Sequence, residues 1–154
     1  MPHDNMQNQS DDIIMIVEDS PEDYEAYMSA LTLQGNIMNP VVWFETGEEA
    51  INYLHRTGEY QGAQHKMPAI VFLDLNLPGM DGRDFLSKLK TSEKTKHLPV
   101  VVMTSSDARQ DIDHCYQAGA NSYVVKPVAL DGFLASIRRL REYWFKVVTL
   151  PVVK

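Results

Sequence analysis

Five polar residues stand at the ends of apolar segments of this sequence, and their types suit phosphoryl chemistry. They are Glu18, Asp19, Asp74, Thr104 and Lys126. Short apolar segments bounded by turn residues are typical of strands buried on both faces of a parallel sheet. Because the carboxyl ends of parallel strands meet at one edge, we expect these five side chains to converge there. The polarity of ordinary loops would explain any one of these residues, but it explains the whole set poorly.

The converging set has the charges that a metal ion and a phosphoryl group need. Three carboxylates repel one another unless a cation lies between them. Mg²⁺ prefers oxygen ligands, keeps several waters and commonly shares a phosphoryl oxygen. Asp74 is then the nucleophile, because carboxylates form acyl phosphates, while Lys126 supplies positive charge and Thr104 a hydroxyl donor. The set therefore predicts Mg²⁺-dependent phosphoryl transfer to Asp74.

The composition is that of one domain of ordinary size with an acidic surface. The 154 residues are 44% hydrophobic and carry a formal net charge of -7, which argues against nucleic acid as a partner. The one cysteine, Cys115, excludes an internal disulfide and favours a reducing, cytoplasmic location. No apolar run approaches the roughly 18 residues of a membrane span, so no membrane association is expected.

Strand-type and helix-type segments alternate five times along the chain. Apolar runs predict strands at residues 13–17, 41–44, 69–73, 99–103 and 122–125. The first helix should follow an N-cap at Ser20, run for about 12–14 residues and stop near Gly35. Later amphipathic segments predict helices at about 47–57, 82–90, 107–118 and 130–148.

This alternation predicts an α/β fold in which helices cover both faces of a parallel sheet, a doubly wound (βα)5 flavodoxin-like sandwich of three layers. We expect residues 13–148 to form this domain. Residues 1–12 should be a flexible N-terminal tail, and residues 149–154 a short C-terminal tail.

Four segments in order, IVEDS, LDLNLPGMDG, VVVMTSS and YVVKP, together resemble the receiver domain of response regulators in two-component signalling. The resemblance covers residues 13–148 and implies the strand order 2-1-3-4-5. It implies that Asp74 is the phosphoacceptor, that Asp19 ligates Mg²⁺ directly and that Glu18 binds the ion through water. Glu18 stands where many members of the family have aspartate, a common variant that leaves metal binding intact.

The resemblance implies roles for five further positions of the site. The backbone carbonyl of Asn76 would complete the metal site, and Lys126 would pair with the phosphoryl group. Thr104 would move its hydroxyl onto that group, and the ring of Tyr123 would follow as an aromatic switch. Pro127 resembles the cis proline that shapes the loop after the last strand.

Three further segments, TGEYQGAQHKMP, CYQAGANSYVVKPV and EYWFKVVTLP, resemble single-domain response regulators associated with bacterial and cyanobacterial phytochrome kinases. The resemblance implies a sensor histidine kinase of phytochrome type as phosphodonor in a phosphorelay. It also implies a signalling protein rather than a turnover enzyme. Only about six residues follow the last expected helix, so we expect no DNA-binding output domain. The output would be a change of surface, made by shifting an equilibrium between two conformations.

The end of the last helix predicts a homodimer interface. Trp144 and Phe145 point in different directions on one helix, and the residues from Val147 to Val153 remain apolar. Both faces of a helix cannot be buried in one small domain, so we expect Trp144, Phe145 and Val148 to contact the fourth and fifth strand–helix units of a second copy. Packing of this tail against its own chain is the alternative.

Two other functions fit a fold of this kind. A small Mg²⁺-dependent phosphatase would use Asp74 as a turnover nucleophile, but it needs a second acid two residues on, where this chain has Asn76. A flavin-binding module would need a hydroxyl-rich or glycine-rich phosphate loop after the first strand, where this chain has VEDSPED. Both are less consistent with the sequence than the receiver.

Overall fold

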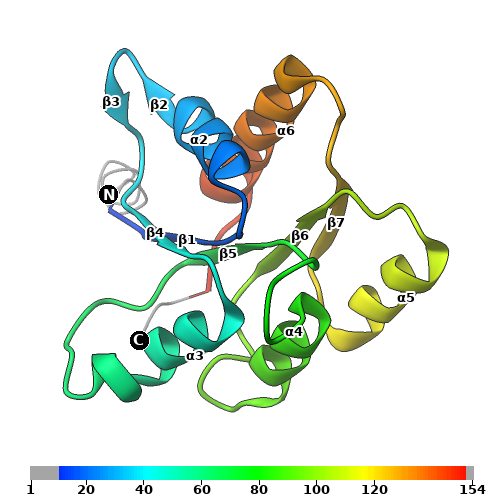
Figure 1. Cartoon of the computed structure of the whole chain (residues 1–154). Coiled ribbons are helices and arrows are strands. Elements are labelled where there is room, and N and C mark those ends of the chain that lie inside the picture. The colour runs from blue at the N-terminus through cyan, green and yellow to red at the C-terminus, as the bar shows by residue number, and fades with distance from the viewer. Residues whose placement is uncertain (1–10, 152–154) are drawn as a thin grey trace.

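Five parallel strands form the central sheet, in the order β4-β1-β5-β6-β7 (Figure 1). This computed structural model describes residues 11–151. The strands are β1 (Ile14–Val17), β4 (Val41–Phe44), β5 (Ile70–Leu73), β6 (Val100–Thr104) and β7 (Ser122–Val125). Counting only these strands along the chain gives 2-1-3-4-5, so the predicted fold class and strand order are confirmed.

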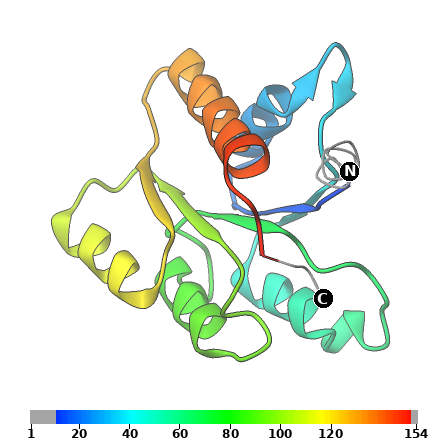
Figure 2. The ribbon, with the colours of Figure 1, turned by 180° about the vertical axis from the view of Figure 1, so that it is seen from behind.

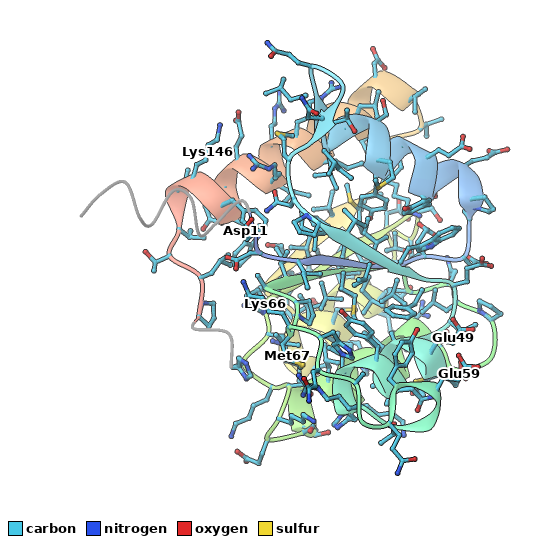
Figure 3. All side chains as sticks on the ribbon, turned by 90° about the vertical axis from the view of Figure 1, so that its left-hand side faces the viewer. Asp11, Glu49, Glu59, Lys66, Met67 and Lys146 are labelled. Atoms are coloured by element: carbon cyan, nitrogen blue, oxygen red, sulfur yellow. The ribbon has the colours of Figure 1, made fainter. Side chains whose placement is uncertain are left out.

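Helices cover both faces of the sheet (Figures 1 and 2). On one face lie α2 (Pro21–Ala30) and α6 (Leu130–Glu142), and on the other lie α3 (Gly47–His55), α4 (Gly82–Thr91) and α5 (Arg109–Ala118). Figure 3 looks onto the β4 edge and shows side chains filling the space between sheet and helices on either side. The described helices include none that is long and apolar enough to cross a membrane.

The apolar strands alternate between two cores, one on each face. Met15 and Val17 of β1 pack among α3, α4 and α5, whereas Ile14 and Ile16 pack with α2 and α6. All four residues of β1 and all four of β5 are buried, as unbroken apolar runs in a parallel sheet require. This burial fixes the register of the strands and therefore the height at which each strand ends.

The predicted helix cap at Ser20 is confirmed, and Thr46 caps α3 in the same way. The Ser20 hydroxyl accepts a hydrogen bond from the backbone N–H of Asp23, three residues on, and Thr46 accepts one from Glu49 in the same way. At the start of α4 the backbones approach closely, because a Cβ on Gly82 would lie 2.3 Å from the carbonyl oxygen of Asp74. Only glycine lets α4 begin against the end of β5.

The first helix is shorter than the sequence predicts. α2 ends at Ala30, and residues expected to continue it form a small antiparallel hairpin of β2 (Thr32–Leu33) and β3 (Asn36–Ile37). The two turn residues, Gln34 and Gly35, have φ values of 51° and 79°. A two-residue turn with both φ angles positive matches the twist of a hairpin, so the chain reverses where the sequence suggested a helix stop.

The end of α6 corrects the premise of the predicted dimer interface. A short π-helix, Tyr143–Val147, follows α6, and it turns Phe145 into the chain's own core, where 1% of the residue is exposed. Trp144 packs half-buried against the same core, and Val148 is also half-buried. The wider π turn brings both aromatic side chains onto one chain's core, so the premise that both faces cannot be buried is wrong for Phe145.

The predicted tails are only partly described. Asp12 forms an ion pair with Lys66, with 3.1 Å between Nζ of Lys66 and Oδ1 of Asp12. Lys66 is labelled at the sheet edge in Figure 3. Residues 1–10 and 152–154 lie outside the described part of the chain. The predicted boundaries at residues 13 and 148 stay predictions.

Candidate functional site

The carboxyl ends of β1, β5, β6 and β7 bring the predicted polar residues to one edge of the sheet. Glu18 and Asp19 follow β1, Asp74 follows β5, Thr104 ends β6, and Lys126 follows β7. The expected convergence of Glu18, Asp74 and Lys126 is confirmed by direct contacts.

Lys126 lies at the centre of these contacts. Its ammonium nitrogen is 2.5 Å from Oε1 of Glu18, 3.0 Å from Oδ2 of Asp74 and 2.6 Å from Oδ2 of Asp23. The lysine side chain is 10% exposed, and the side chains of Glu18 and Asp74 are 1% and 9% exposed. A cation and two carboxylates are therefore held together with little access to water.

Glu18, Asp19 and Asp74 form a cluster that could hold a metal ion. Each offers one carboxylate oxygen, and these oxygens all lie within 4.8 Å of one another. Glu18 and Asp74 are buried, whereas Asp19 is exposed. Hard oxygen ligands with one solvent-facing member suit a divalent cation that keeps some of its waters. The donor set therefore fits the predicted metal.

The charges of the cluster shift the pKa values of its members. Burial would raise the pKa of Asp74, but the charge and hydrogen bond of Lys126 and the backbone N–H of Asn76 lower it below its usual value. Burial, followed by the negative charge of Asp74, raises the pKa of Glu18 to about 8. Burial would lower the pKa of Lys126, yet its hydrogen bonds with Asp23 and Glu18 raise it. Without a metal ion, Asp74 is thus the ionised carboxylate and Lys126 the ionised amine.

Backbone groups hold the two buried acids in place. The N–H of Asn76 donates to Oδ1 of Asp74 at 3.2 Å, and the N–H of Ser20 donates to Oε2 of Glu18 at 3.2 Å. The indole N–H of Trp43 donates to the backbone carbonyl of Glu18 at 2.7 Å. Asn76 itself is exposed, and the role of its carbonyl as a metal ligand stays a prediction.

Thr104 is buried, and within residues 11–151 its hydroxyl has no hydrogen-bond partner. The hydroxyl of Tyr123 donates to the backbone carbonyl of Ser106, two residues beyond Thr104, at 2.8 Å. The hydroxyl of Ser106 donates to Asp111 on α5 at 2.6 Å, and Asp111 also accepts from Arg83 of α4 at 2.8 Å. Tyr123 is therefore linked to the segment that follows Thr104.

Asp23 and Trp43 are contact residues that the sequence did not assign to the site. The first turn of α2 carries Asp23 over the sheet edge to Lys126. Trp43 belongs to the neighbouring strand, and nothing in its local sequence signals the contact with Glu18.

The prediction of a cis peptide bond before Pro127 is wrong. No cis peptide bond occurs in the described part of the chain, in line with the ordinary preference of X–Pro bonds for trans. The loop still directs Lys126 into the site, because the backbone N–H of Lys126 donates to the backbone carbonyl of Thr104 at 2.7 Å.

The arrangement suits a carboxylate nucleophile. Asp74 presents an ionised oxygen beside a fixed ammonium group, and the metal-capable cluster shares this carboxylate. The Lys126 ammonium and a bound divalent cation would together offset the negative charge of a phosphoryl group during its transfer to Asp74.

Comparisons with known proteins identify the family. The family model described as the response regulator receiver domain matches residues 14–138. The response regulator Rcp1 of Synechocystis sp. is 32% identical over 139 residues, which is 90% of this chain and 92% of that protein. A probable methanogenesis regulatory protein of Methanothrix harundinacea, FilR2, is 33% identical over 132 residues, covering 86% and 83% of the two chains.

Solved structures give the same result. The phosphorylated cyanobacterial phytochrome response regulator RcpA is 34% identical, with a TM-score of 0.86 over 92% of this chain and 99% of that one. The Mn²⁺-bound form of Rcp1 is 32% identical, with a TM-score of 0.84 over the same shares. The chain therefore belongs to the response regulator receiver domain family.

Proposed function

We propose that this chain accepts a phosphoryl group on Asp74 from the phosphohistidine of a sensor histidine kinase, with Mg²⁺ in the acidic cluster. The observation that carries the proposal is the 3.0 Å contact between the Lys126 ammonium and an Asp74 carboxylate whose pKa is lowered. A carboxylate that stays ionised beside a fixed cation is prepared to attack a phosphorus atom.

In the proposed step a carboxylate oxygen of Asp74 forms a bond to phosphorus. The bond between phosphorus and the donor imidazole breaks, and its electron pair goes to the ring nitrogen. Lys126 donates to the transferred group, and the hydroxyl of Thr104 is the donor that turns toward it. Bound Mg²⁺ would supply positive charge at the phosphoryl oxygens, held by Asp19, Asp74 and, through water, Glu18.

Tyr123 is the proposed reporter of this step. Its hydroxyl donates a hydrogen bond to the backbone carbonyl of Ser106, so displacement of Thr104 would change the environment of the Tyr123 ring. The signal would then be a change of surface around α5 and β7. The acceptor is not a turnover enzyme on this proposal, because Asn76 stands where a phosphatase needs a second acid.

A phytochrome-type kinase is the proposed donor. Besides RcpA, a solved structure described as the bacteriophytochrome response regulator AtBRR is 37% identical, with a TM-score of 0.68 over 92% of this chain. A cytoplasmic location, expected from the single cysteine, is part of the same proposal, as is the absence of nucleic acid and membrane among the partners.

A homodimer is also proposed, but on a different surface from the one that the sequence suggested. Phe145 is buried in its own chain, whereas Tyr143 and Val147 of the same π-helix are 48% and 72% exposed. These two side chains, with half-buried Trp144 and Val148, are the apolar surface that a second copy would cover. Sedimentation at micromolar concentration tests this, and a monomer both with and without a phosphoryl analogue would contradict it.

Beryllofluoride, an analogue of an aspartyl phosphate, tests the phosphoacceptor. Trp43 reports on the site because its indole N–H binds Glu18 and its ring stacks on Tyr24 with centroids 3.9 Å apart. A Trp144→Phe background leaves Trp43 as the one tryptophan. We expect a fluorescence change that requires Mg²⁺ and that is lost in Asp74→Asn. Equal binding by Asp74→Asn, or no binding by the parent protein, would overturn the proposal.

A further inference from the structure

All three hydrogens of the Lys126 ammonium are committed before any phosphoryl group arrives. A lysine ammonium has three donors and no acceptor. Here it contacts Glu18, Asp23 and Asp74 at 2.5, 2.6 and 3.0 Å. Since the lysine side chain is 10% exposed, water cannot readily replace any of these partners. To donate to a phosphoryl oxygen on Asp74, Lys126 must therefore give up one bond.

The three acceptors are not equivalent. Glu18 and Asp74 belong to the cluster whose oxygens could hold a metal ion, and Asp23 does not. A metal ion would engage the carboxyl oxygens of Glu18 and Asp74 and so weaken their hold on the lysine. The charge of Asp23 would remain directed at Lys126. Asp23 is thus the acid that competes most directly with a phosphoryl group for this ammonium.

The position of Asp23 is fixed by its helix. Its backbone N–H is bonded to the hydroxyl of Ser20, the cap of α2, at 3.2 Å. Ser20 in turn donates its own N–H to Glu18. On the other side of the contact, α2 packs against α6, which begins shortly after Lys126. The 2.6 Å contact therefore joins two well-anchored parts of the fold.

Asp23 can also release the lysine at low cost. Its side chain is 33% exposed, against 1% for Glu18 and 9% for Asp74, so water can solvate its carboxylate once the bond breaks. Both Asp23 and Lys126 line a pocket of about 550 Å³, which also includes Glu22 and Phe133. The contact between Asp23 and Lys126 therefore borders this pocket.

We propose that Asp23 is a positioning residue that holds the Lys126 ammonium before phosphorylation and competes with the phosphoryl group for it. This deepens the proposed function and rests on it. Asp23 thereby lowers the affinity of the site for a phosphoryl group and sets how readily the phosphorylated form accumulates. Removing its charge frees one donor of Lys126 for the phosphoryl oxygens.

The test compares two neighbouring charge-neutral variants. Asp23→Asn removes the competing charge, and Glu22→Gln removes the same charge one residue earlier, from an exposed side chain at the rim of the pocket. Binding of beryllofluoride at saturating Mg²⁺ is measured by titration calorimetry. Because a hydrogen bond to a charged group contributes more than a neutral one, we expect Asp23→Asn to bind about fivefold to tenfold more tightly. Glu22→Gln should bind within about twofold of the parent protein, since exposed charges are screened.

Two further measurements separate competition from a structural effect. Asp23→Glu keeps the charge and should restore the parent affinity, while thermal unfolding confirms that each variant is folded. Proton exchange of the Lys126 ammonium, followed by nitrogen-15 NMR without beryllofluoride, should be faster in Asp23→Asn than in Glu22→Gln. Unchanged exchange would show that the pair is not formed in solution and would overturn the proposal.

Equal tightening in Asp23→Asn and Glu22→Gln would reduce the effect to net charge and overturn the proposal. Weaker binding by Asp23→Asn would overturn it in the other direction, because Asp23 would then hold Lys126 in its productive position. If the parent protein itself fails to bind, the proposed function falls and this inference with it. Normal parent binding with no difference between the variants overturns this inference alone.

Discussion

Replacing Thr104 with valine should stabilise the protein and impair phosphoryl binding at the same time. Thr104 is 0% exposed, and within the described residues its hydroxyl has no hydrogen-bond partner. Valine has nearly the same shape and suits a strand, so the substitution removes a buried polar group without leaving a cavity.

The size of the gain follows from the cost of an unpaired hydroxyl. A buried polar group without a partner costs about 1–3 kcal/mol, so Thr104→Val should raise the free energy of unfolding by about that amount. For a domain of this size each kcal/mol shifts the melting temperature by about 2–4 °C. The variant should therefore melt about 2–12 °C higher. Beryllofluoride should bind it about tenfold more weakly, because the hydroxyl is the donor that a phosphoryl oxygen would use.

The chain contains a matched control for this experiment. Thr95 is equally buried, but its hydroxyl donates to the carbonyl of Leu89 at 2.8 Å. Thr95→Val breaks this bond and should lower the free energy of unfolding by about 1 kcal/mol. Urea unfolding followed by circular dichroism, without Mg²⁺ or phosphate, measures both variants. If Thr104→Val is destabilised as much as Thr95→Val, the Thr104 hydroxyl is satisfied in solution and the reasoning is refuted.

Two further predictions concern the supports of the site. Gly82→Ala should lower the free energy of unfolding by more than about 3 kcal/mol, because its Cβ would lie 2.3 Å from the carbonyl oxygen of Asp74 and 2.5 Å from the Cα of Leu75; a loss below about 1 kcal/mol by urea unfolding would contradict this close approach. The hydrogen bonds of Arg83 and Ser106 lower the pKa of Asp111 from 3.8 to about 2. Because the folded pKa lies below the unfolded one, the stabilisation is present above about pH 4 and is lost as the pH falls toward 2. The difference in unfolding free energy between the parent protein and Asp111→Asn should shrink over that interval, and a difference that does not change with pH would show that the charge of Asp111 is not involved.

The sheet and the central site could be predicted because the strands are unusually plain in sequence. β1 and β5 are unbroken apolar runs that stop directly before Glu18 and Asp74, and β6 is apolar up to Thr104, its last residue; the fold buries all three completely. Once the strands are parallel, the convergence of Glu18, Asp74 and Lys126 follows from geometry alone. No knowledge of the packing of helices is needed for that step.

The parts that escaped prediction depend on packing or on unusual backbone geometry. Asp23 reaches Lys126 only because α2 lies beside α6, a contact that no local pattern reports. The hairpin after α2 depends on a positive φ at Gln34, a residue type that rarely signals one. Phe145 enters the core through a π turn, whereas a regular helix would have turned it by a different angle.

The segment from Thr104 to Ser106 connects the site to the surface on the far side of the sheet. Among residues 11–151 the Thr104 hydroxyl has no hydrogen-bond partner, and Ser106 is hydrogen-bonded to both Tyr123 of β7 and Asp111 of α5. Asp111 is joined in turn to Arg83 of α4. Because Ser106 is two residues from Thr104, the proposed movement of that hydroxyl toward Asp74 would strain the hydrogen bonds that join Ser106 to β7 and α5 and, through Asp111, the bond to α4. We infer that phosphorylation of Asp74 changes the surface around α5 and β7 through Ser106. Weakening the Arg83–Asp111 pair should therefore alter the change in environment of the Tyr123 ring without altering Glu18, Asp19 or Asp74.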